Sequence, residues 1–510
     1  MPQLCVLICQ RDDQASSTLT ELARFDLPSS DPATVQRATT LDELETSTLT
    51  TGMLILRRLF QLAWLQLDAA LVTRYRAEHP GVALPLDGSE PLTVVSRFGT
   101  VLLRRQVLAD SARRTHVLPG TAALPAHEGV VTTRGLQEWA CLLPQELPFS
   151  AVARLLGWQT QEPEVLSDTT IRTLVKRHGQ LLREAEQAES VALGDTPLEA
   201  RQHAVVAPLE RPRRRAGWPT ELNAAVDAAL AREQVRPPEG VSWADWERVL
   251  AARRAEADLS IEELRHLGPR LAPGDVLLCV DEVLTPKTGG AGRWELRTAT
   301  LRTPWGVRYL SGTGATFLPV VQALARVAVG EEGRLLLLSD GARWIRTFFT
   351  DDLRTLPGAQ HVLDWYHLEH KCRDLASRIC RDKEEKGVFL RRLFRRLWAG
   401  RVAAAVAWLE GYRPQARNTA VLDELIGYLQ AREEWIPTYR QRRRERRYIG
   451  SGHVEKANDR LVARRQKQRG MTWSLQSSDS LAALRTPVLN GGWDPYWADR
   501  RVLPLVADAA

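Results

Sequence analysis

The strongest constraint on the fold comes from two short apolar runs that each lead to an aspartate. Residues 276–280 read VLLCV and are followed by Asp281, and residues 335–338 read LLLL and are followed, after one serine, by Asp340. Short continuous apolar runs are typical of strands that are covered on both faces. A carboxylate beside such a run is costly to desolvate unless it is paired or coordinated. We therefore expect two buried strands that lie side by side and each bear an aspartate, so that the two carboxylates come near the same point.

The surrounding segments extend this sheet. Residues 293–303 and 306–314 predict two more strands, residues 317–329 predict a helix, and residues 359–368 predict a short strand that runs into a helix. Three adjacent strands followed by helix, strand, helix and strand are typical of a mixed-direction sheet in an α/β domain. Residues 381–440 contain helical patterns and no strand pattern.

The upstream half predicts a different kind of structure. Residues 41–79 have helical periodicity, and residues 92–108 favour a β-hairpin centred on Phe98-Gly99. The apolar positions of the expected helix include Leu54, Leu59, Leu62 and Leu65.

Two shorter helices are expected next, at residues 148–158 and at residues 167–179, the second with Ser167 as its N-cap. Three basic side chains are expected to be exposed on the second helix: Arg172, Lys176 and Arg177. The pair resembles a helix-turn-helix, but its loop is longer than the usual three or four residues. Two ordinary packed helices are an equally good interpretation.

A third carboxylate follows the helical stretch. Glu455 lies on a helix that is expected to begin after the Gly-Ser-Gly turn at 450–452 and to pack on the sheet through Val454, Ala457 and Leu461. Taken singly, Asp340 before a glycine is ordinary turn chemistry, and Glu455 is an ordinary charge in a first helical turn.

Taken together, the three carboxylates predict a metal site. Carboxylate oxygens are the protein ligands that Mg²⁺ prefers, and two such ions can cleave and join phosphodiesters. Asp281, Asp340 and Glu455 are therefore the expected catalytic and ligand residues for two Mg²⁺ or Mn²⁺ ions.

Positive charge is concentrated around this third carboxylate. Residues 436–470 hold ten Arg and two Lys against three acidic residues, whereas the whole chain has a net charge of +7. Such a segment is either a solvated basic face or a phosphate-binding surface, and we favour DNA contact. The residues expected to contact DNA here are Arg443, Arg444, Arg446, Arg447, Arg464, Arg465, Lys467 and Arg469, with Trp473 either stacking on a base or lying in the core.

Other classes of protein are disfavoured by what the sequence contains. The six cysteines form no CxxC pair, and His361, His367 and His370 have no completing ligand at the usual spacing, so we expect no zinc site. No P-loop or dinucleotide fingerprint is present, so we expect no nucleotide cofactor. The most apolar segment begins at Met53, is short and contains two arginines, and the N-terminus does not read as a signal peptide. We expect a cytoplasmic protein without membrane association.

Four segments resemble the catalytic core of bacterial insertion-sequence transposases: VDEV, LLLSDGARWI, HVLDWYHL and GSGHVEKANDRLVARRQKQRGMTWS. The similarity covers roughly residues 275–500 and is nearest to the Kra-type family, with more distant similarity to Lre-type and Mutator-like elements. It implies an RNase H-like fold and a DDE triad of Asp281, Asp340 and Glu455. It also implies an all-helical insertion between Asp340 and Glu455, which are 115 positions apart. The family's Asp-x-x-His signature is matched by Asp364 and His367, which implies a role near the active site.

The resemblance implies a multidomain α/β protein in which a mainly helical DNA-binding region precedes the catalytic core. The expected parts are an N-terminal helical region at 1–90, a β-hairpin and helix-turn-helix-like region at 91–200, a linker and helical segment at 201–270, the first part of the core at 271–380, the helical insertion at 381–440, and the Glu-bearing helix with the C-terminal tail at 441–510.

The implied function is that of a transposase that binds terminal inverted repeats and target DNA as a homo-oligomer and catalyses cleavage and strand transfer. Two alternatives stay open. One is a transposase-derived DNA-binding protein that no longer cuts, and the other is an RNase H-like nuclease without strand transfer.

Overall fold

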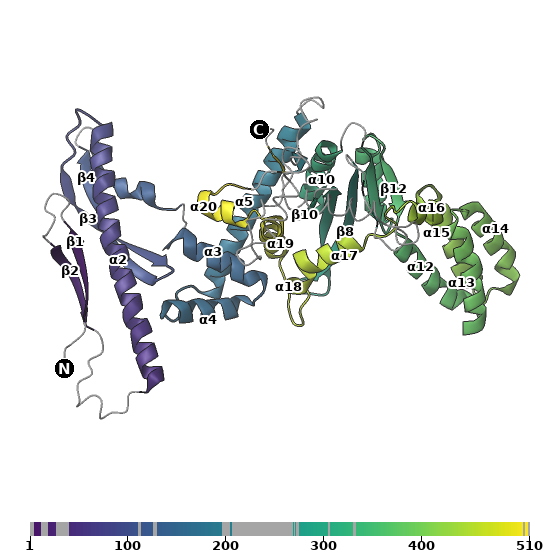
Figure 1. Cartoon of the computed structure of the whole chain (residues 1–510), viewed down its shortest axis with the longest axis horizontal. Coiled ribbons are helices and arrows are strands. Elements are labelled where there is room, and N and C mark those ends of the chain that lie inside the picture. The colour runs from purple at the N-terminus through teal and green to yellow at the C-terminus, as the bar shows by residue number, and fades with distance from the viewer. Residues whose placement is uncertain are drawn as a thin grey trace, which may run out of the picture. The chain divides into compact units, whose positions relative to one another are not determined.

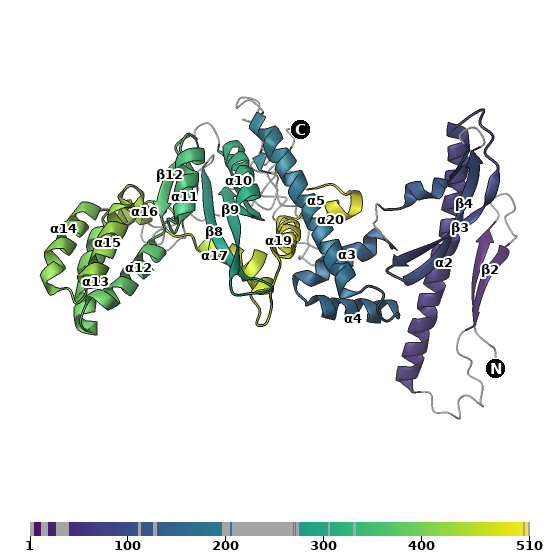
Figure 2. The same ribbon diagram turned by 180° about the vertical axis from the view of Figure 1, so that it is seen from behind.

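The computed structural model describes residues 5–11, 19–26, 40–110, 114–125, 130–195, 205–206, 269, 271, 275–303, 306–329, 333–502 and 505–507. The chain is a multidomain α/β protein with two compact units, Met1–Val175 and Lys176–Ala510, and Figures 1 and 2 show its elements from opposite sides. Most of the linker and helical segment expected at 201–270 lies outside the described residues. The division into six parts stays a prediction.

The first unit is built on the long helix α2 (Leu41–Glu78). Thr40 and Glu43 form a capping box at its N-terminus, in which each residue's side chain accepts a hydrogen bond from the other's backbone N–H. The buried Trp64 packs against the hairpin that the sequence predicted. The strands of this hairpin are β3 (Leu86–Ser96) and β4 (Gly99–Asp110).

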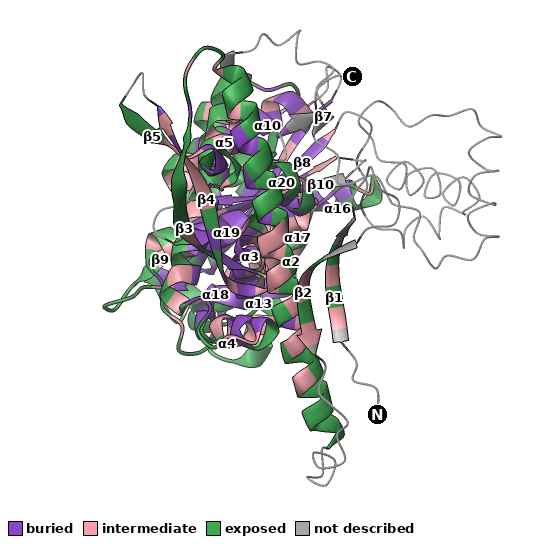
Figure 3. Ribbon diagram, turned by 90° about the vertical axis from the view of Figure 1, so that its left-hand side faces the viewer, coloured by how far each residue is buried: buried purple, intermediate pink, exposed green. Residues whose placement is uncertain are grey.

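The packed side of α2 differs from the one expected. Leu54, Leu59 and Leu65 are exposed, whereas Met53 and Trp64 are buried. Leucines occur around much of the circumference of this helix, so periodicity alone could not identify the stripe that meets the sheet. Figure 3 shows the exposed N-terminal end of α2. Among the described residues no helix, α2 included, is both long and apolar enough to cross a membrane.

Smaller elements complete this unit. Strands β1 (Cys5–Arg11) and β2 (Leu19–Asp26) pair with each other. Strands β5 (Thr115–Val117) and β6 (Val131–Thr132) extend the hairpin to a sheet of order β5-β4-β3-β6. The remaining elements are the 3₁₀ turns η1 (Pro119–Ala123) and η2 (Leu143–Gln145) and the helix α3 (Arg134–Leu142).

The two expected shorter helices are α4 (Phe149–Thr160) and α5 (Asp168–Asp195), and both begin where the sequence predicted. The hydroxyl of Ser167 accepts a hydrogen bond from the N–H of Thr170 at 3.1 Å, which confirms Ser167 as the N-cap. Helix α5 continues well beyond the predicted end. Arg172 is exposed as expected, but Lys176 and Arg177 are half-buried, because their part of α5 packs on further elements of the second unit.

The second unit contains a five-stranded sheet of order β10-β9-β8-β11-β12. Its strands are β8 (Val276–Pro286), β9 (Arg293–Thr303), β10 (Gly306–Gly312), β11 (Leu335–Ser339) and β12 (Gln360–Leu363). The first three are antiparallel neighbours, and β11 and β12 are added parallel to β8. The strands and the mixed direction were predicted from the sequence.

Helices cover both faces of this sheet, and the apolar residues on its two faces belong to two separate hydrophobic cores. Val276 and Leu278 face α10 (Gly314–Ala328) and α11 (Arg343–Phe348), which is followed by the π-turn η3 (Phe349–Leu353). Leu277 and Cys279 face the opposite layer, which begins with α12 (Trp365–Ile379). This alternation is the two-residue period of a strand, and it also decides the direction in which the next residues of β8 point.

The segment expected to be a helical insertion is helical throughout the described residues 381–440. Its elements are α13 (Lys383–Trp398), α14 (Val402–Tyr412), η4 (Arg413–Gln415), α15 (Thr419–Gln430), η5 (Glu433–Trp435) and α16 (Tyr439–Arg444). They share one hydrophobic core with α12, in which Trp365 contacts the rings of Trp398 and Tyr439.

The C-terminal part returns to the sheet. Its helical elements are α17 (Gly452–Asn458), the π-turn η6 (Asp459–Ala463), α18 (Arg464–Gln466), α19 (Leu475–Asn490) and α20 (Trp493–Asp499). The short strand β13 (Val506–Ala507) pairs with β7 (Val205–Val206). Ala457 and Leu461 pack against Val283 and Leu296 of the sheet, as the sequence predicted for the helix that carries Glu455.

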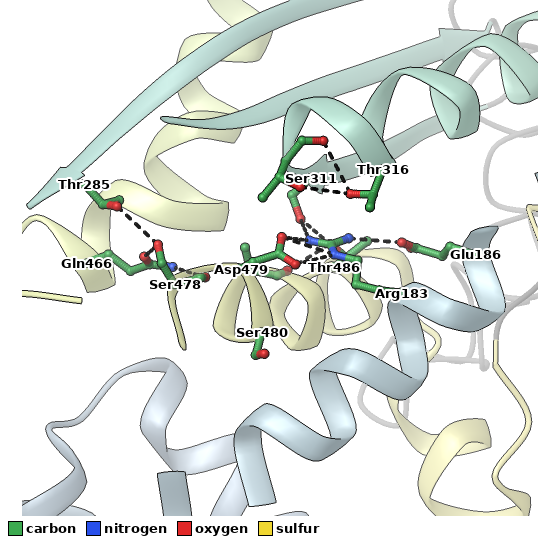
Figure 4. A network of polar contacts seen from close by, with 12 residues as sticks. Arg183, Glu186, Thr285, Ser311, Thr316, Gln466, Ser478, Asp479, Ser480 and Thr486 are labelled. Atoms are coloured by element: carbon green, nitrogen blue, oxygen red, sulfur yellow. Dashed lines mark hydrogen bonds and ion pairs between the residues drawn. The ribbon is translucent and has the colours of Figure 1, made fainter. Parts of the chain in front are cut away.

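The later part of α5 is fastened to α19 by a polar network (Figure 4). The buried guanidinium of Arg183 contacts Asp479 and Glu186, each at 3.0 Å, and donates to the hydroxyl of Ser311. The two helices approach so closely at Gly179 that a Cβ there would lie 2.5 Å from the Cα of Ser480. The glycine permits this backbone contact because it has no side chain.

Candidate active site

Asp281, in the middle of β8, and Asp340, directly after the end of the adjacent strand β11, lie next to each other on the sheet. The parallel register pairs Leu338 with Cys279, so continuing it by two residues brings Asp340 level with Asp281. Asp281 points to the same side as Cys279, and Asp340 to the same side as Leu338, because alternate residues share a face. That side is the one covered by α12 and by the start of α17.

Two hydrogen bonds orient the half-buried carboxylate of Asp281. Its Oδ1 accepts from the backbone N–H of Glu282 at 2.8 Å, and its Oδ2 accepts from Nδ2 of Asn458 at 2.6 Å. Burial raises the pKa of this carboxyl and the charge of Asp340 raises it further, whereas the two hydrogen bonds oppose the rise. The effect of Asp340 on this pKa is what two carboxylates at short range produce, and a bound cation would relieve their repulsion.

Asp364 follows the end of β12 and is 1% exposed. One of its oxygens caps α12 by accepting from the N–H groups of Tyr366 and His367, at 2.6 and 3.1 Å. The other accepts from both the backbone N–H and the hydroxyl of Ser451. Burial opposes ionisation of Asp364, but the contacts with His367 and Ser451 outweigh it and hold the pKa of this carboxyl below its ordinary value. Both oxygens of Asp364 thus accept hydrogen bonds from the start of α12 or from Ser451, so this carboxylate holds those two segments together and is less suited to be a metal ligand.

Helix α17 begins directly after Ser451 and carries Glu455. Val454 and Ala457 are buried under the helix, whereas the side chain of Glu455 is 58% exposed. Its Oε1 lies 3.9 Å from Nε2 of His367. The carboxylate of Glu455 therefore lies on the same side of the sheet as Asp281 and Asp340.

His367 lies close to all the acidic side chains of the site. Its Nδ1 lies 3.6 Å from Oδ2 of Asp364. This contact raises the pKa of His367 to about 9 against the opposing effect of burial, and the charges of Asp340 and Glu455 add to the rise. The charge of His367 in turn lowers the pKa of Asp281. An imidazolium therefore sits among the carboxylates and balances part of their charge.

The donor set fits a hard divalent cation. Asp281, Asp340 and Glu455 supply carboxylate oxygens on one side of the sheet, and oxygen is the donor that Mg²⁺ and Mn²⁺ prefer. In the part of the chain that the structure describes, no three His, Cys, Asp or Glu side chains are close enough to hold a metal ion as they stand. Asp281 is held by Asn458 and by the backbone of Glu282, whereas the exposed Glu455 faces His367, so Glu455 is the side chain that would turn towards a shared cation.

Most of the basic side chains expected to contact DNA are exposed. Figure 1 shows α16 and α18, which carry or adjoin them, on either side of α17 in this view. The exposed side chains are Arg443, Arg444, Arg447, Arg464, Lys467 and Arg469, and Arg446 is half-buried. Arg447 also contacts Glu445 at 2.9 Å.

Two expected DNA contacts are buried instead. Trp473 is 4% exposed, and its indole N–H donates to the backbone oxygen of Gln466. Arg465 is also buried, with its guanidinium over the ring of Trp473. The backbone of Trp473 extends the end of β8 by accepting from Thr288 and donating to Pro286. The core interpretation of this tryptophan is therefore the correct one, because the segment that carries it is added to the sheet.

Several residues of the site were missed from the sequence. Ser451 was read only as part of a turn, and Asn458 was not singled out, although it lies three residues after Glu455 and so on the same side of the helix. Tyr366 was also missed; its ring is 58% exposed and lies against Gly450. A search for polar residues one helical turn from each expected ligand would have found Asn458.

Comparison with models of known protein families finds no match, and comparison with curated proteins finds none either. The transposase resemblance therefore stays a prediction from the sequence.

Proposed function

We propose that this chain is an insertion-sequence transposase of the DDE type with an RNase H-like core. The observation that carries the proposal is that carboxylates from β8, from the end of β11 and from α17 all lie near His367 on one side of the sheet. The sheet supports it too, because β8, β9 and β10 are antiparallel neighbours while β11 and β12 are added parallel to β8. The helical segment between the second and third carboxylates matches the insertion that the resemblance implies.

The proposed reaction is cleavage of a DNA strand followed by strand transfer. Held by Asp281, Asp340 and Glu455, two divalent ions would activate the attacking oxygen and stabilise the leaving one. In the first step, water forms a bond to phosphorus as the bond to the 3′-oxygen breaks, which leaves a 3′-hydroxyl and a 5′-phosphate. In the second, that 3′-hydroxyl attacks a phosphodiester of the target and displaces a target 3′-oxygen.

The chain's own residues have separate parts in this scheme. Asp281 and Asp340 are placed by the rigid strands, and Glu455 by a helix that is anchored to Asp364 through Ser451. His367 balances the carboxylate charge and keeps the side chains together until a cation binds. Strands and an anchored helix thus fix the backbone positions from which the three carboxylates act.

DNA recognition is assigned to two regions. Helices α4 and α5 form the proposed helix-turn-helix that reads the terminal inverted repeats, with Arg172 exposed at the start of α5. Arg172 also contacts Asp168 and the ring of Phe149, so its guanidinium is held near the α4–α5 junction. The exposed arginines and lysine before and after α17 are proposed to bind phosphates near the scissile bond. The protein is proposed to act as a homo-oligomer that joins two ends.

The test is a donor plasmid that contains the coding region with its native flanking DNA, incubated with the purified full-length chain and Mg²⁺ or Mn²⁺. We expect cleaved ends and joined products. Asp281→Asn, Asp340→Asn and Glu455→Gln should each lower the rate at least a thousandfold while DNA affinity stays within a few fold. Asp351→Asn, which changes an exposed carboxylate elsewhere in the same unit, should act like the unchanged protein.

Each result has a clear reading. Cleaved ends without joined product would identify a nuclease, and DNA binding without cleavage would identify a DNA-binding protein that has lost activity. Retained cleavage in any one of the three variants would remove that residue from the site.

A further inference from the structure

Asn458 links β8, at Asp281, to the adjacent strand β9. Its Nδ2 donates to Oδ2 of Asp281 at 2.6 Å, and its Oδ1 accepts from the hydroxyl of Thr298. Asp281 and Thr298 are opposite each other in the antiparallel register of β8 and β9. One amide therefore spans a cross-strand pair and is hydrogen-bonded at both ends.

This arrangement leaves a single orientation for the amide. An ionised carboxylate such as Asp281 only accepts hydrogen bonds, so the NH₂ group of Asn458 must face it. The fully buried hydroxyl of Thr298 donates to the remaining oxygen. With Glu282 donating to the other oxygen of Asp281, the plane of that carboxylate is determined by two fixed donors.

Asn458 also belongs to the helix that carries Glu455. The two residues are three positions apart in α17, which puts them on neighbouring positions of one side. At the opposite end of this seven-residue helix, Ser451 is bound to Asp364. Helix α17 is thus attached to the sheet at both ends, and Glu455 lies between the two attachments. Directly after Asn458 the helix widens into the π-turn η6, a local irregularity that is frequent at functional sites.

We propose that Asn458 is a positioning residue that orients Asp281 and sets its separation from Glu455, so that the two carboxylates bind divalent cations together. Its part in DNA cleavage rests on the proposed function, whereas its effect on cation binding does not. Groups that orient metal-binding side chains in this way typically change metal affinity by about 10- to 100-fold when they are removed.

The experiment measures Mn²⁺ binding to the full-length chain by the loss of the free Mn²⁺ paramagnetic resonance signal. We expect Asn458→Ala to weaken binding about tenfold or more. Thr298→Val, which keeps the shape of the side chain but removes the donor that orients the amide, should cause a smaller loss. Thr298→Ser keeps the hydroxyl and should bind Mn²⁺ as the unchanged protein does, and Asp351→Asn provides a control for loss of one exposed carboxylate.

Strand transfer provides the second measurement. In Asn458→Ala the Mn²⁺ concentration for half-maximal rate should rise with the dissociation constant, and saturating Mn²⁺ should restore most of the rate. A purely structural role would lower the rate at every Mn²⁺ concentration without moving that midpoint. Thermal unfolding of each variant identifies any loss of folded protein, and Thr298→Val keeps the test informative if Asn458→Ala unfolds.

The possible failures are distinguishable. Unchanged Mn²⁺ affinity in Asn458→Ala overturns the inference even if the unchanged protein joins DNA. Absence of Mn²⁺ binding by the unchanged protein overturns it as well. Weakened Mn²⁺ binding in the variant, together with no DNA cleavage by the unchanged protein, supports the inference and counts against the proposed function.

Discussion

Asp281, Asp340 and Glu455 depend to different degrees on the tertiary structure. The two aspartates could be placed on or directly after buried strands from the apolar runs before them, and the period of a strand predicts the face to which they point. Glu455 could be placed on a helix but not next to His367, 88 residues earlier in the chain. The position of Asn458, one turn after Glu455, could be noticed, but the partners of Asn458 and Ser451 could not be assigned, since Asp281 and Asp364 come from other elements.

Tyr366 gives a prediction at this scale. Its ring is exposed beside His367 in the first turn of α12, and under the proposed function we expect it to stack on an unpaired base near the scissile phosphate. Stacking of a base on an aromatic ring contributes about 1–3 kcal/mol, so Tyr366→Ala should weaken binding of a DNA end with unpaired flanking bases by about 5- to 150-fold.

The measurement is fluorescence anisotropy of a labelled DNA end in Ca²⁺. Tyr366→Phe keeps the ring and should bind like the unchanged protein, and fully paired DNA should be much less affected by Tyr366→Ala. Equal losses for both kinds of DNA would show that the ring does not stack on an unpaired base.

At the scale of elements, the strands and helices of the second unit follow the predicted order, and the differences lie in how they pack. Helix α5 was expected to be short and to expose Lys176 and Arg177, but it continues to Asp195 and meets α19. The sequence contained no local sign of this contact, because Arg183 and Asp479 are 296 residues apart. On α2, the exposed Leu54 and the buried Trp64 show the same limitation.

The contact between α5 and α19 leads to a prediction for stability. Removing one partner of a buried ion pair leaves the other charge without compensation. Arg183→Met should therefore lower the free energy of unfolding by about 3 kcal/mol, measured by urea denaturation of the full chain. Adding Asp479→Asn removes one of the uncompensated charges and should recover part of that loss.

The control is Arg413→Met, which breaks a pair with Asp423 that is about half exposed on both sides. Exposed pairs contribute about 0–1 kcal/mol, so this change should be small. Equal effects of Arg183→Met and Arg413→Met would mean that the α5–α19 network adds no more to stability than an exposed pair.

At the scale of the whole molecule, charge distribution matters more than net charge. The chain carries +7 overall, yet the segment that contains Glu455 has twelve basic and three acidic residues. Lys467 and Arg469 are exposed at its end. Because each phosphate contact releases a counterion, Lys467→Ser with Arg469→Ser should make the slope of log affinity against log salt shallower by about two.

This prediction is checked by titrating DNA of unrelated sequence at several salt concentrations. Arg391→Ser with Arg392→Ser removes the same charge from exposed positions on α13 and should leave the slope unchanged. An equal change in both double variants would show that the attraction is general rather than local to the segment after α17.

The sequence by itself determined the order of strands and helices in the sheet of the second unit, the aspartates that its buried strands carry, and the basic segment around Glu455. These properties are local, because they depend on the periodicity of apolar residues and on composition. Only the tertiary structure decided which side chains meet. The contacts of Asn458 with Asp281, of Asp364 with Ser451 and of Arg183 with Asp479 join residues that are 87 or more positions apart. Pairing over such distances depends on sheet register and helix packing, which no local pattern in one sequence encodes.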